Sequence, residues 1–226
     1  MKKFVIGDIH GGYKALEQCL DRSGFDDNKD LLISLGDVCD GWPETKECIN
    51  RLLKIKHEIH CLGNHDDWAS DWMRYGSMPS IWTSQGGMAT LESYDLGKTI
   101  PEEHINYLSN SVLKYEDNNC LFVHAGFNWY VPIEENDKHE IIWDRNLFND
   151  AIKHPDNVYG KYEEIFIGHT TTSRFSDIPI KYANVWFLDQ GAGWEGKLSI
   201  MNIDTHEFWQ SDKVETLYPK YHGRRK

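Results

Sequence analysis

The sequence has few cysteines, little basic charge and no long apolar run. Its five cysteines, at positions 19, 39, 48, 61 and 120, are an odd number and form no CxxC pair. This pattern argues against a disulfide framework and against zinc held by thiolates. A reducing compartment suits such a chain, and we predict a cytoplasmic location. No stretch reaches the ~18 apolar residues of a membrane helix, and the apolar run after Lys3 is too short for a signal peptide.

The shortage of basic residues also limits the partners of the chain. Lys and Arg number 24 against 36 Asp and Glu, for a formal net charge of -12. Such a chain is a poor candidate for binding a long nucleic acid, whereas a small phosphorylated substrate remains compatible because a bound cation inverts the local field. Hydrophobic residues make up 40% of the 226 residues, which is enough for a core and excludes a disordered chain. We predict one domain over 1–226, with a frayed basic tail at about 221–226.

Short apolar runs alternate with helical patterns in the first half of the chain. The periodicity predicts strands over 4–6, 31–35 and 58–62, and helices over 13–22, 43–55 and 68–74. This alternation is typical of parallel strands joined by crossover helices, and therefore of an α/β fold. Strands predicted over 120–123, 164–167, 185–188 and 198–203 indicate a mixed sheet, in a second layer, in the second half.

Potential metal ligands follow the apolar runs at the predicted strand ends. Six runs end in a glycine beside such a residue, or in the residue itself. These residues are Asp8 and His10, Asp37, Asn64 and His65, His124, His169, and Asp189. Ligands bind beyond the carboxyl ends of strands in open α/β sheets, and a buried polar cluster of this size is costly without a function. Oxygen and imidazole ligands without thiolates suit Mn, Fe, Zn or Mg.

Five blocks of these residues, in order, resemble the signature of the calcineurin-like metallophosphoesterases. The blocks are Asp8-Ile9-His10-Gly11, Gly36-Asp37 with Asp40, Gly63-Asn64-His65-Asp66, His124-Ala125-Gly126 and Gly168-His169-Thr170. The sequence is most similar to the phosphoprotein phosphatase type, including bacterial and phage serine/threonine phosphatases and symmetrical diadenosine tetraphosphatases. The segments Gln85–Tyr94 and Trp143-Asp144-Arg145 match the bacterial branch as well. The resemblance extends from Lys3 to about Asp204 and implies a four-layer αββα sandwich of two mixed sheets flanked by helices.

The resemblance also implies a site for two divalent metal ions. Asp8, His10 and Asp37 would hold the first ion, and Asp37, Asn64, His124 and His169 would hold the second. Asp37 would bridge the two, because a carboxylate has two oxygens. We expect manganese, with Fe, Zn, Ni or Mg as alternatives. A hydroxide bridging the metals would attack phosphorus in line, without a covalent enzyme intermediate.

Four further roles follow from the resemblance. His65 would act as general acid toward the leaving oxygen, and Asp40 would orient its imidazole. Spacing alone equally allows Asp40 to cap the helix beginning near Pro43. Arg145 would bind the substrate phosphate together with Asn64, and the alternative for Arg145 is a surface salt bridge.

One position departs from the family pattern. Most phosphoprotein phosphatases have Arg-Gly after the residue equivalent to Asp40, whereas this chain reads Gly41-Trp42. An arginine that would bind phosphate is therefore missing at position 41. Arg74 and Arg51 are candidates to replace it, although the sequence gives no geometric reason for either.

Four tryptophans lie close to the motif blocks in sequence: Trp42, Trp68, Trp72 and Trp129. Such residues can form an aromatic wall that stacks a nucleobase. Packing in the core or in loops is the interpretation that we favour for them.

The combined prediction is a metal-dependent phosphatase that hydrolyses a phosphate monoester. Its substrate would be a phosphorylated small molecule, a nucleotide or a phosphoprotein, with no membrane involved. One alternative is a hydrolase of diadenosine polyphosphates or nucleotide anhydrides. A second alternative is a non-catalytic relative that binds metal without turnover, which only the missing arginine supports.

Overall fold

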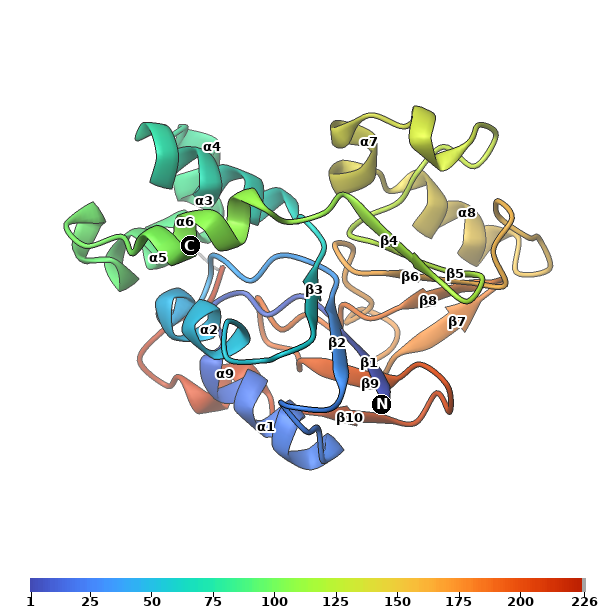
Figure 1. The fold of residues 1–226 in the computed structure, drawn as a ribbon, viewed down its shortest axis with the longest axis horizontal. Helices are drawn as coiled ribbons and strands as arrows, with labels where there is room; N and C mark the ends of the chain where they lie inside the picture. Colours follow the sequence, from blue (N-terminus) through green and yellow to red (C-terminus); the bar gives the residue numbers. More distant parts are fainter. Residues whose placement is uncertain (225–226) are drawn as a thin grey trace.

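Residues 1–224 are described by a computed structural model, shown in Figure 1. The strands are β1 (Lys3–Ile6), β2 (Leu31–Ser34), β3 (Glu58–His60), β4 (Lys114–Asp117), β5 (Cys120–Val123), β6 (Glu164–Ile167), β7 (Ile180–Tyr182), β8 (Val185–Phe187), β9 (Ser199–Asn202) and β10 (Phe208–Gln210). The helices are α1 (Tyr13–Ser23), α2 (Thr45–Leu52), α3 (Asn64–Tyr75), α4 (Ser80–Trp82), α5 (Met88–Ser93), α6 (Glu102–Ser109), α7 (Lys138–Trp143), α8 (Asn146–Lys153) and α9 (Val214–Leu217).

These strands form two five-stranded mixed sheets. The first sheet has the order β10-β9-β1-β2-β3, with β1, β2 and β3 parallel and β9 and β10 antiparallel to their neighbours. The second sheet has the order β4-β5-β6-β8-β7, with β5, β6 and β8 parallel and β4 and β7 antiparallel. The predicted mixed sheet in a second layer is therefore confirmed.

Side chains of each central strand alternate between an inner and an outer core. In β6, Phe166 packs between the sheets, whereas Ile165 and Ile167 pack under the helices of the second sheet. The ring of Phe166 stacks on that of Phe122 from β5, with centroids 4.9 Å apart. Both faces of these strands are buried, and this explains why they read as continuous apolar runs in the sequence.

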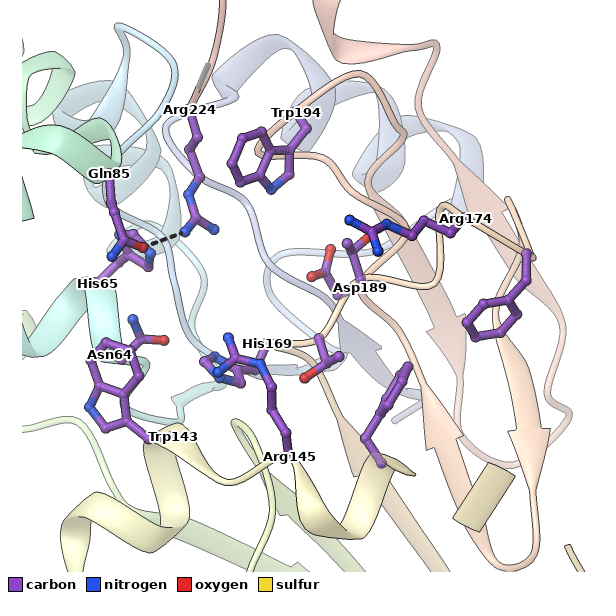
Figure 2. A pocket seen from close by; sticks show the side chains of 14 residues that line it. Asn64, His65, Gln85, Trp143, Arg145, His169, Arg174, Asp189, Trp194 and Arg224 are labelled. Atoms are coloured by element: carbon purple, nitrogen blue, oxygen red, sulfur yellow. Dashed lines mark hydrogen bonds between the residues drawn. The ribbon is translucent and has the colours of Figure 1, made fainter. Parts of the chain in front are cut away.

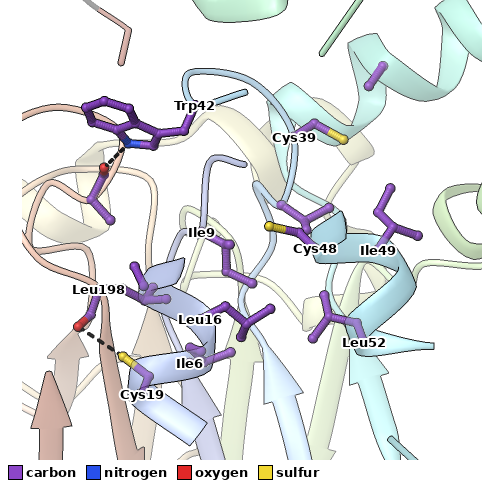
Figure 3. Packing of buried hydrophobic residues seen from close by; sticks show 14 of the residues in the cluster. Ile6, Ile9, Leu16, Cys19, Cys39, Trp42, Cys48, Ile49, Leu52 and Leu198 are labelled. Carbon is purple, nitrogen blue, oxygen red and sulfur yellow. Dashed lines mark hydrogen bonds between the residues drawn. The ribbon is translucent and has the colours of Figure 1, made fainter. Parts of the chain in front are cut away.

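The outer layers are helical, which completes the predicted four-layer sandwich. In Figure 1, α7 and α8 cover the outer face of the second sheet, and α1 and α2 cover the first. Figure 3 shows Leu16 of α1 and Ile49 of α2 packing with Ile6 of β1 in the first outer core. These crossover helices return the chain to the same end of the sheet, so the carboxyl ends of β1, β2 and β3 lie side by side.

Several boundaries differ from the sequence-based prediction. The helix expected over 68–74 begins at Asn64, so the motif residues Asn64 and His65 lie in its first turn. The helix expected over 43–55 begins at Thr45 and ends at Leu52. The strands β4, β7 and β10 were not predicted, because none has a fully buried residue and their sequences lack a clear apolar run.

The predicted tail at 221–226 is described only as far as Arg224, and residues 225 and 226 lie outside the described part of the chain. The prediction of a frayed end is wrong for 221–224. Arg224 N donates a hydrogen bond to the carbonyl of Gly193 at 2.9 Å, and Tyr221 N bonds the carbonyl of Tyr218 at 2.9 Å. Within residues 1–224, no helix has both the length and the apolarity needed to cross a membrane.

Candidate metal centre

The strand ends of both sheets meet in one buried cluster of aspartates and histidines. Asp8 and His10 follow β1, and Asp37 follows β2 in the first sheet. His124 and His169 follow β5 and β6 in the second sheet. His10, Asp37 and His169 have φ of 51°, 53° and 63°, a left-handed conformation that is unfavourable for such residues. Backbone strain of this kind persists where the surrounding structure imposes it, and it concentrates at functional sites.

The ligand atoms form two groups that share Asp37. Asp8, His10 and Asp37 make one group, and Asp37, His124 and His169 make the other. Within each group the ligand atoms lie within 4.8 Å of one another. The shared carboxylate oxygen, Asp37 Oδ2, lies 3.3 Å from His124 Nε2 and 3.8 Å from His10 Nε2. A carboxylate placed between two groups is the arrangement that a bridging ligand requires.

Two of the imidazoles are held with Nε2 toward the cluster. His10 Nδ1 donates to the carbonyl of Cys39 at 3.1 Å, and His124 Nδ1 donates to the carbonyl of Leu35 at 2.7 Å. Hydrogen bonds of this kind fix the tautomer and the orientation of metal-binding histidines. The third imidazole, that of His169, has a buried Nε2 with no hydrogen-bond partner among the described residues. An orphaned buried nitrogen on a residue grouped with Asp37 and His124 fits a metal ligand.

The charges of the cluster are strongly perturbed. Burial, together with the nearby Asp189, raises the pKa of Asp8 well above its usual range. Burial also opposes the charge on Asp37, but the adjacent imidazoles of His124 and His65 hold the pKa of that carboxyl well below its usual range. Burial and the charge of His124 lower the pKa of His169 to about 2, so this imidazole is neutral and its lone pair is open. Cations would relieve the repulsion among the buried carboxylates.

Asn64 joins the second group from the first turn of α3. Its Oδ1 lies 3.2 Å from His124 Nε2. The preceding Gly63 permits this approach, because a Cβ on Gly63 would lie 2.1 Å from Asp37 Oδ1. Gly168 has the same role before His169, since its Cβ would lie 2.0 Å from Asp8 Oδ1. The motif glycines therefore make room for carboxylates that any side chain would displace.

His65 lies beside the cluster and is paired with Asp40. Its Nδ1 donates to Asp40 Oδ2 at 2.7 Å, and both side chains are buried. Trp82 Nε1 and Thr90 Oγ1 each donate to the same carboxylate at 2.7 Å. Asp40 therefore contacts His65 and does not cap α2, which has no side-chain cap. The other nitrogen, His65 Nε2, is buried with no partner among the described residues, although His65 lines the neighbouring pocket.

A pocket of about 410 Å³ opens over the cluster (Figure 2). Its walls are formed by Asn64, His65, Gln85, Trp143, Arg145, Phe148, His169, Thr170, Thr171, Arg174, Phe175, Asp189, Trp194 and Arg224. Arg145 stands at the start of α8, and its guanidinium lies beside His169 in Figure 2. Arg145 has no carboxylate within 4.0 Å in the described part of the chain, so the surface salt bridge considered for it is absent there.

The four tryptophans singled out from the sequence do not line this pocket. Trp42 is buried, donates to the carbonyl of Ala192 and stacks on Tyr218. Trp72 packs against Trp82 in the same core. The favoured packing role is therefore confirmed for Trp42 and Trp72, and none of the four forms the aromatic wall that was the alternative in this pocket. Trp143 and Trp194 line the pocket in their place.

Sequence reasoning missed other pocket residues. Asp189 was recognised as a strand-end carboxylate, and Gln85 lies in the segment that matched the bacterial branch, but neither received a role. Arg174 and Trp194 carry no sequence signal. Arg224 was hidden in a basic tail whose residues were expected to be frayed. Arg51 and Arg74, the two replacement cations considered, lie elsewhere: Arg51 pairs with Glu17 and Asp27, and Arg74 lies over Tyr75.

Comparison with known proteins agrees with this geometry. Residues 1–197 match the calcineurin-like phosphoesterase family. The chain is 28% identical to serine/threonine-protein phosphatase 1 of Salmonella typhimurium, over 88% of this chain and 91% of the relative. It is 29% identical to the symmetrical bis(5'-nucleosyl)-tetraphosphatase of Coxiella burnetii, over 67% of this chain but only 49% of that relative.

Solved structures show the same fold. A crystal structure of a candidate diadenosine tetraphosphatase aligns over 92% of both chains, with a TM-score of 0.72 and 20% sequence identity. A serine/threonine phosphatase from Saccharomyces cerevisiae aligns over 95% of this chain and 81% of the other, with a TM-score of 0.63 and 15% identity. The two mixed sheets and their outer helices are thus those of a metallophosphatase fold.

Proposed function

Because this chain belongs to the calcineurin-like phosphoesterases, a family of metal-dependent hydrolases, we propose that it hydrolyses phosphate monoesters at a dinuclear metal centre. The observation that carries this proposal is the pair of buried ligand groups sharing Asp37. Asp8, His10 and Asp37 would hold one ion, and Asp37, Asn64, His124 and His169 the other. Two divalent cations bound there would polarise the phosphoryl oxygens and lower the pKa of a water molecule between them.

The protein's own groups would orient the phosphate and protonate the leaving oxygen. Arg145 reaches the pocket without a carboxylate partner among the described residues, and its planar guanidinium suits two phosphate oxygens. Asn64, at the pocket wall, would hydrogen-bond the same phosphate. His65 would donate the proton on Nε2, because Asp40 accepts the hydrogen bond from Nδ1 and fixes the orientation of the imidazole.

Manganese is the first metal to test, and the expected result is a stabilised fold. Mn²⁺ at one hundred times its Kd should raise the free energy of unfolding by about 2.7 kcal/mol, because it binds only the folded cluster. Thermal unfolding with and without the ion, after removal of bound metal by a chelator, measures this shift. In a His124→Asn variant, Mn²⁺ should raise the stability by a smaller amount. An equal shift in that variant would place the ion outside the cluster.

Activity is tested on the same metal-stripped protein. With Mn²⁺ restored, we expect fast hydrolysis of an aryl phosphomonoester and none with the chelator present. An Asp8→Asn variant, purified in the same way, controls for a contaminating phosphatase. Absence of Mn²⁺-dependent release by the wild type, with both metals bound, would contradict the proposed function and favour the non-catalytic alternative.

A second candidate function is cleavage of diadenosine polyphosphates or related anhydrides. The observation that favours it is the number of arginines in the pocket. Arg174 and Arg224 accompany Arg145, which is more positive charge than a single phosphate needs. In Figure 2, Arg174 and Arg145 enter the pocket from different sides. Release of mononucleotides from diadenosine tetraphosphate, with little release from the monoester, would assign this function instead.

A further inference from the structure

Arg224 enters the pocket through a slot lined by glycines. A Cβ on Gly41 or on Gly86 would lie 3.1 Å from Arg224 Cγ, and one on Gly193 would lie 2.9 Å from Arg224 Cδ. The backbone is fixed by the hydrogen bond from Arg224 N to the carbonyl of Gly193. Gly223, just before it, packs so close to Trp42 that a Cβ would lie 2.8 Å from that ring. Close packing against these glycines and the backbone hydrogen bond to Gly193 therefore fix the position of Arg224.

The guanidinium of Arg224 forms no salt bridge in the described part of the chain, although its charge favours the ionised form of the buried Asp189 carboxyl in the same pocket. It lies 3.3 Å from His10 Nε2 and 3.3 Å from Gln85 Oε1, and it stacks over Trp194 at 5.0 Å. No carboxylate oxygen of residues 1–224 lies within 4.0 Å of it. Its Nε is buried and lacks a hydrogen-bond partner among these residues. A partly buried cation with an unused donor is costly unless an anion completes the site.

The direction of the side chain indicates where such an anion would lie. Figure 2 shows Arg224 and Arg145 entering the pocket from opposite sides, with His169 near Arg145 and His65 near Arg224. Both arginines line the same cavity above the ligand cluster. An anion between them would meet two guanidinium groups, and phosphate is the anion that such planar donors suit best.

We propose that Arg224 is a second phosphate-binding residue, which serves this chain in place of an arginine at position 41. The proposal rests on the proposed function, since the phosphate would be that of the substrate. Gly41 has φ of 99°, so a side chain there would be strained, and the space it would take is used by Arg224. The side chain of Arg224, from a distant part of the chain, thus occupies the space that the absence of a side chain at Gly41 leaves free.

The contact with His10 limits when Arg224 can act. His10 Nε2 is the atom that would bind a metal, and its lone pair serves either the metal or the guanidinium. With a metal on His10, the guanidinium would keep Gln85 and Trp194 as neighbours, and its remaining donors would be available to phosphate. The test is therefore made at saturating metal.

The experiment compares Arg224→Gln, Arg224→Lys and the control Arg74→Gln in the Mn²⁺-saturated protein. Calorimetric titration gives the Kd for inorganic phosphate, and steady-state kinetics gives kcat and KM for an aryl phosphomonoester. Loss of a charged hydrogen-bond donor should raise the phosphate Kd of Arg224→Gln by about 10- to 100-fold, with a similar rise in KM. Arg224→Lys should recover part of the affinity. Arg74, exposed on α3 and outside the pocket, should have no effect.

Each outcome decides between the proposal and a named alternative. A phosphate Kd unchanged in Arg224→Gln overturns the proposal. Tighter phosphate binding or faster turnover in Arg224→Gln also overturns the proposal. It would show that Arg224 blocks access of the substrate to the pocket. An equal loss in the Lys and Gln variants, accompanied by an equal fall in melting temperature, assigns a structural role. A fourth result would separate the two proposals: the wild type hydrolyses no substrate, but Arg224→Gln still binds phosphate more weakly than the wild type does. That result would refute the proposed function and support the phosphate-binding role of Arg224.

Discussion

An Asp37→Asn variant is expected to lose roughly 10³-fold or more in kcat, because several kcal/mol of charge stabilisation depend on the metals that it would bridge. Asp37 is the only residue shared by the two ligand groups formed within the described residues. The amide keeps the shape of the carboxylate and tolerates the φ of 53° found there, so the fold should persist. It removes the negative charge and one acceptor from the centre of the cluster.

The measurement is kcat for an aryl phosphomonoester together with the metal content of the protein by elemental analysis. Metal content should fall along with activity, since both groups lose a ligand. Asp71→Asn, an exposed change on α3, is the matched control and should leave both quantities unchanged. Activity within tenfold of the wild type in Asp37→Asn would show that Asp37 is not a bridge.

The second large effect is expected for His65→Asn, which should reduce the rate by about 10²–10⁴ while the metal content stays unchanged. His65 Nε2 is buried at the pocket and has no partner among the described residues, whereas Nδ1 is engaged by Asp40. A group held in this way can deliver a proton to one oxygen only. Loss of His65 should therefore slow departure of the leaving group and leave metal binding unchanged.

The leaving group provides the sharper test of this role. The defect in His65→Asn should be largest for alkyl phosphates, whose departing oxygen is strongly basic, and should shrink for 4-nitrophenyl phosphate, whose oxygen needs little protonation. Asp40→Asn should show the same trend at smaller amplitude, because it only orients the imidazole. His154→Asn, a change at an exposed histidine just after the end of α8 and outside the pocket, is the control. A defect independent of the leaving group would reassign His65 to another role.

The clustering of the candidate ligand residues could be predicted from the sequence because the fold places them by a simple rule. Buried parallel strands read as apolar runs, and their carboxyl ends share one edge of a sheet, so residues just beyond Ile6 and Ser34 lie together in the first sheet. Those just beyond Val123 and Ile167 lie together in the second sheet in the same way. The place of Asn64 beside the cluster could be predicted for the same reason, although its helix begins four residues before the predicted start. The prediction held where position along a strand determines position in space.

Arg224 could not be predicted, since its contact with His10 spans 214 positions of sequence and follows no periodic pattern. Its location depends on small clearances at Gly41, Gly86 and Gly193, which a sequence shows only as glycines. The tryptophans show that closeness along the chain does not place a side chain at the site. Trp42 and Trp72 are close to the motifs along the chain, but the side of the backbone on which they emerge turns them into the core.

The division of the ligands between the two sheets has a mechanical consequence. Asp8, His10, Asp37 and Asn64 belong to the first half of the sandwich, and His124 and His169 to the second. Ions coordinated by both groups would link the two halves of the folded protein, and because they bind only the folded cluster they would stabilise it by mass action. All five cysteines are free thiols. In this fold the metal ions needed for catalysis would also hold the two sheets together, so that the stability of the sandwich would depend on the concentration of free metal.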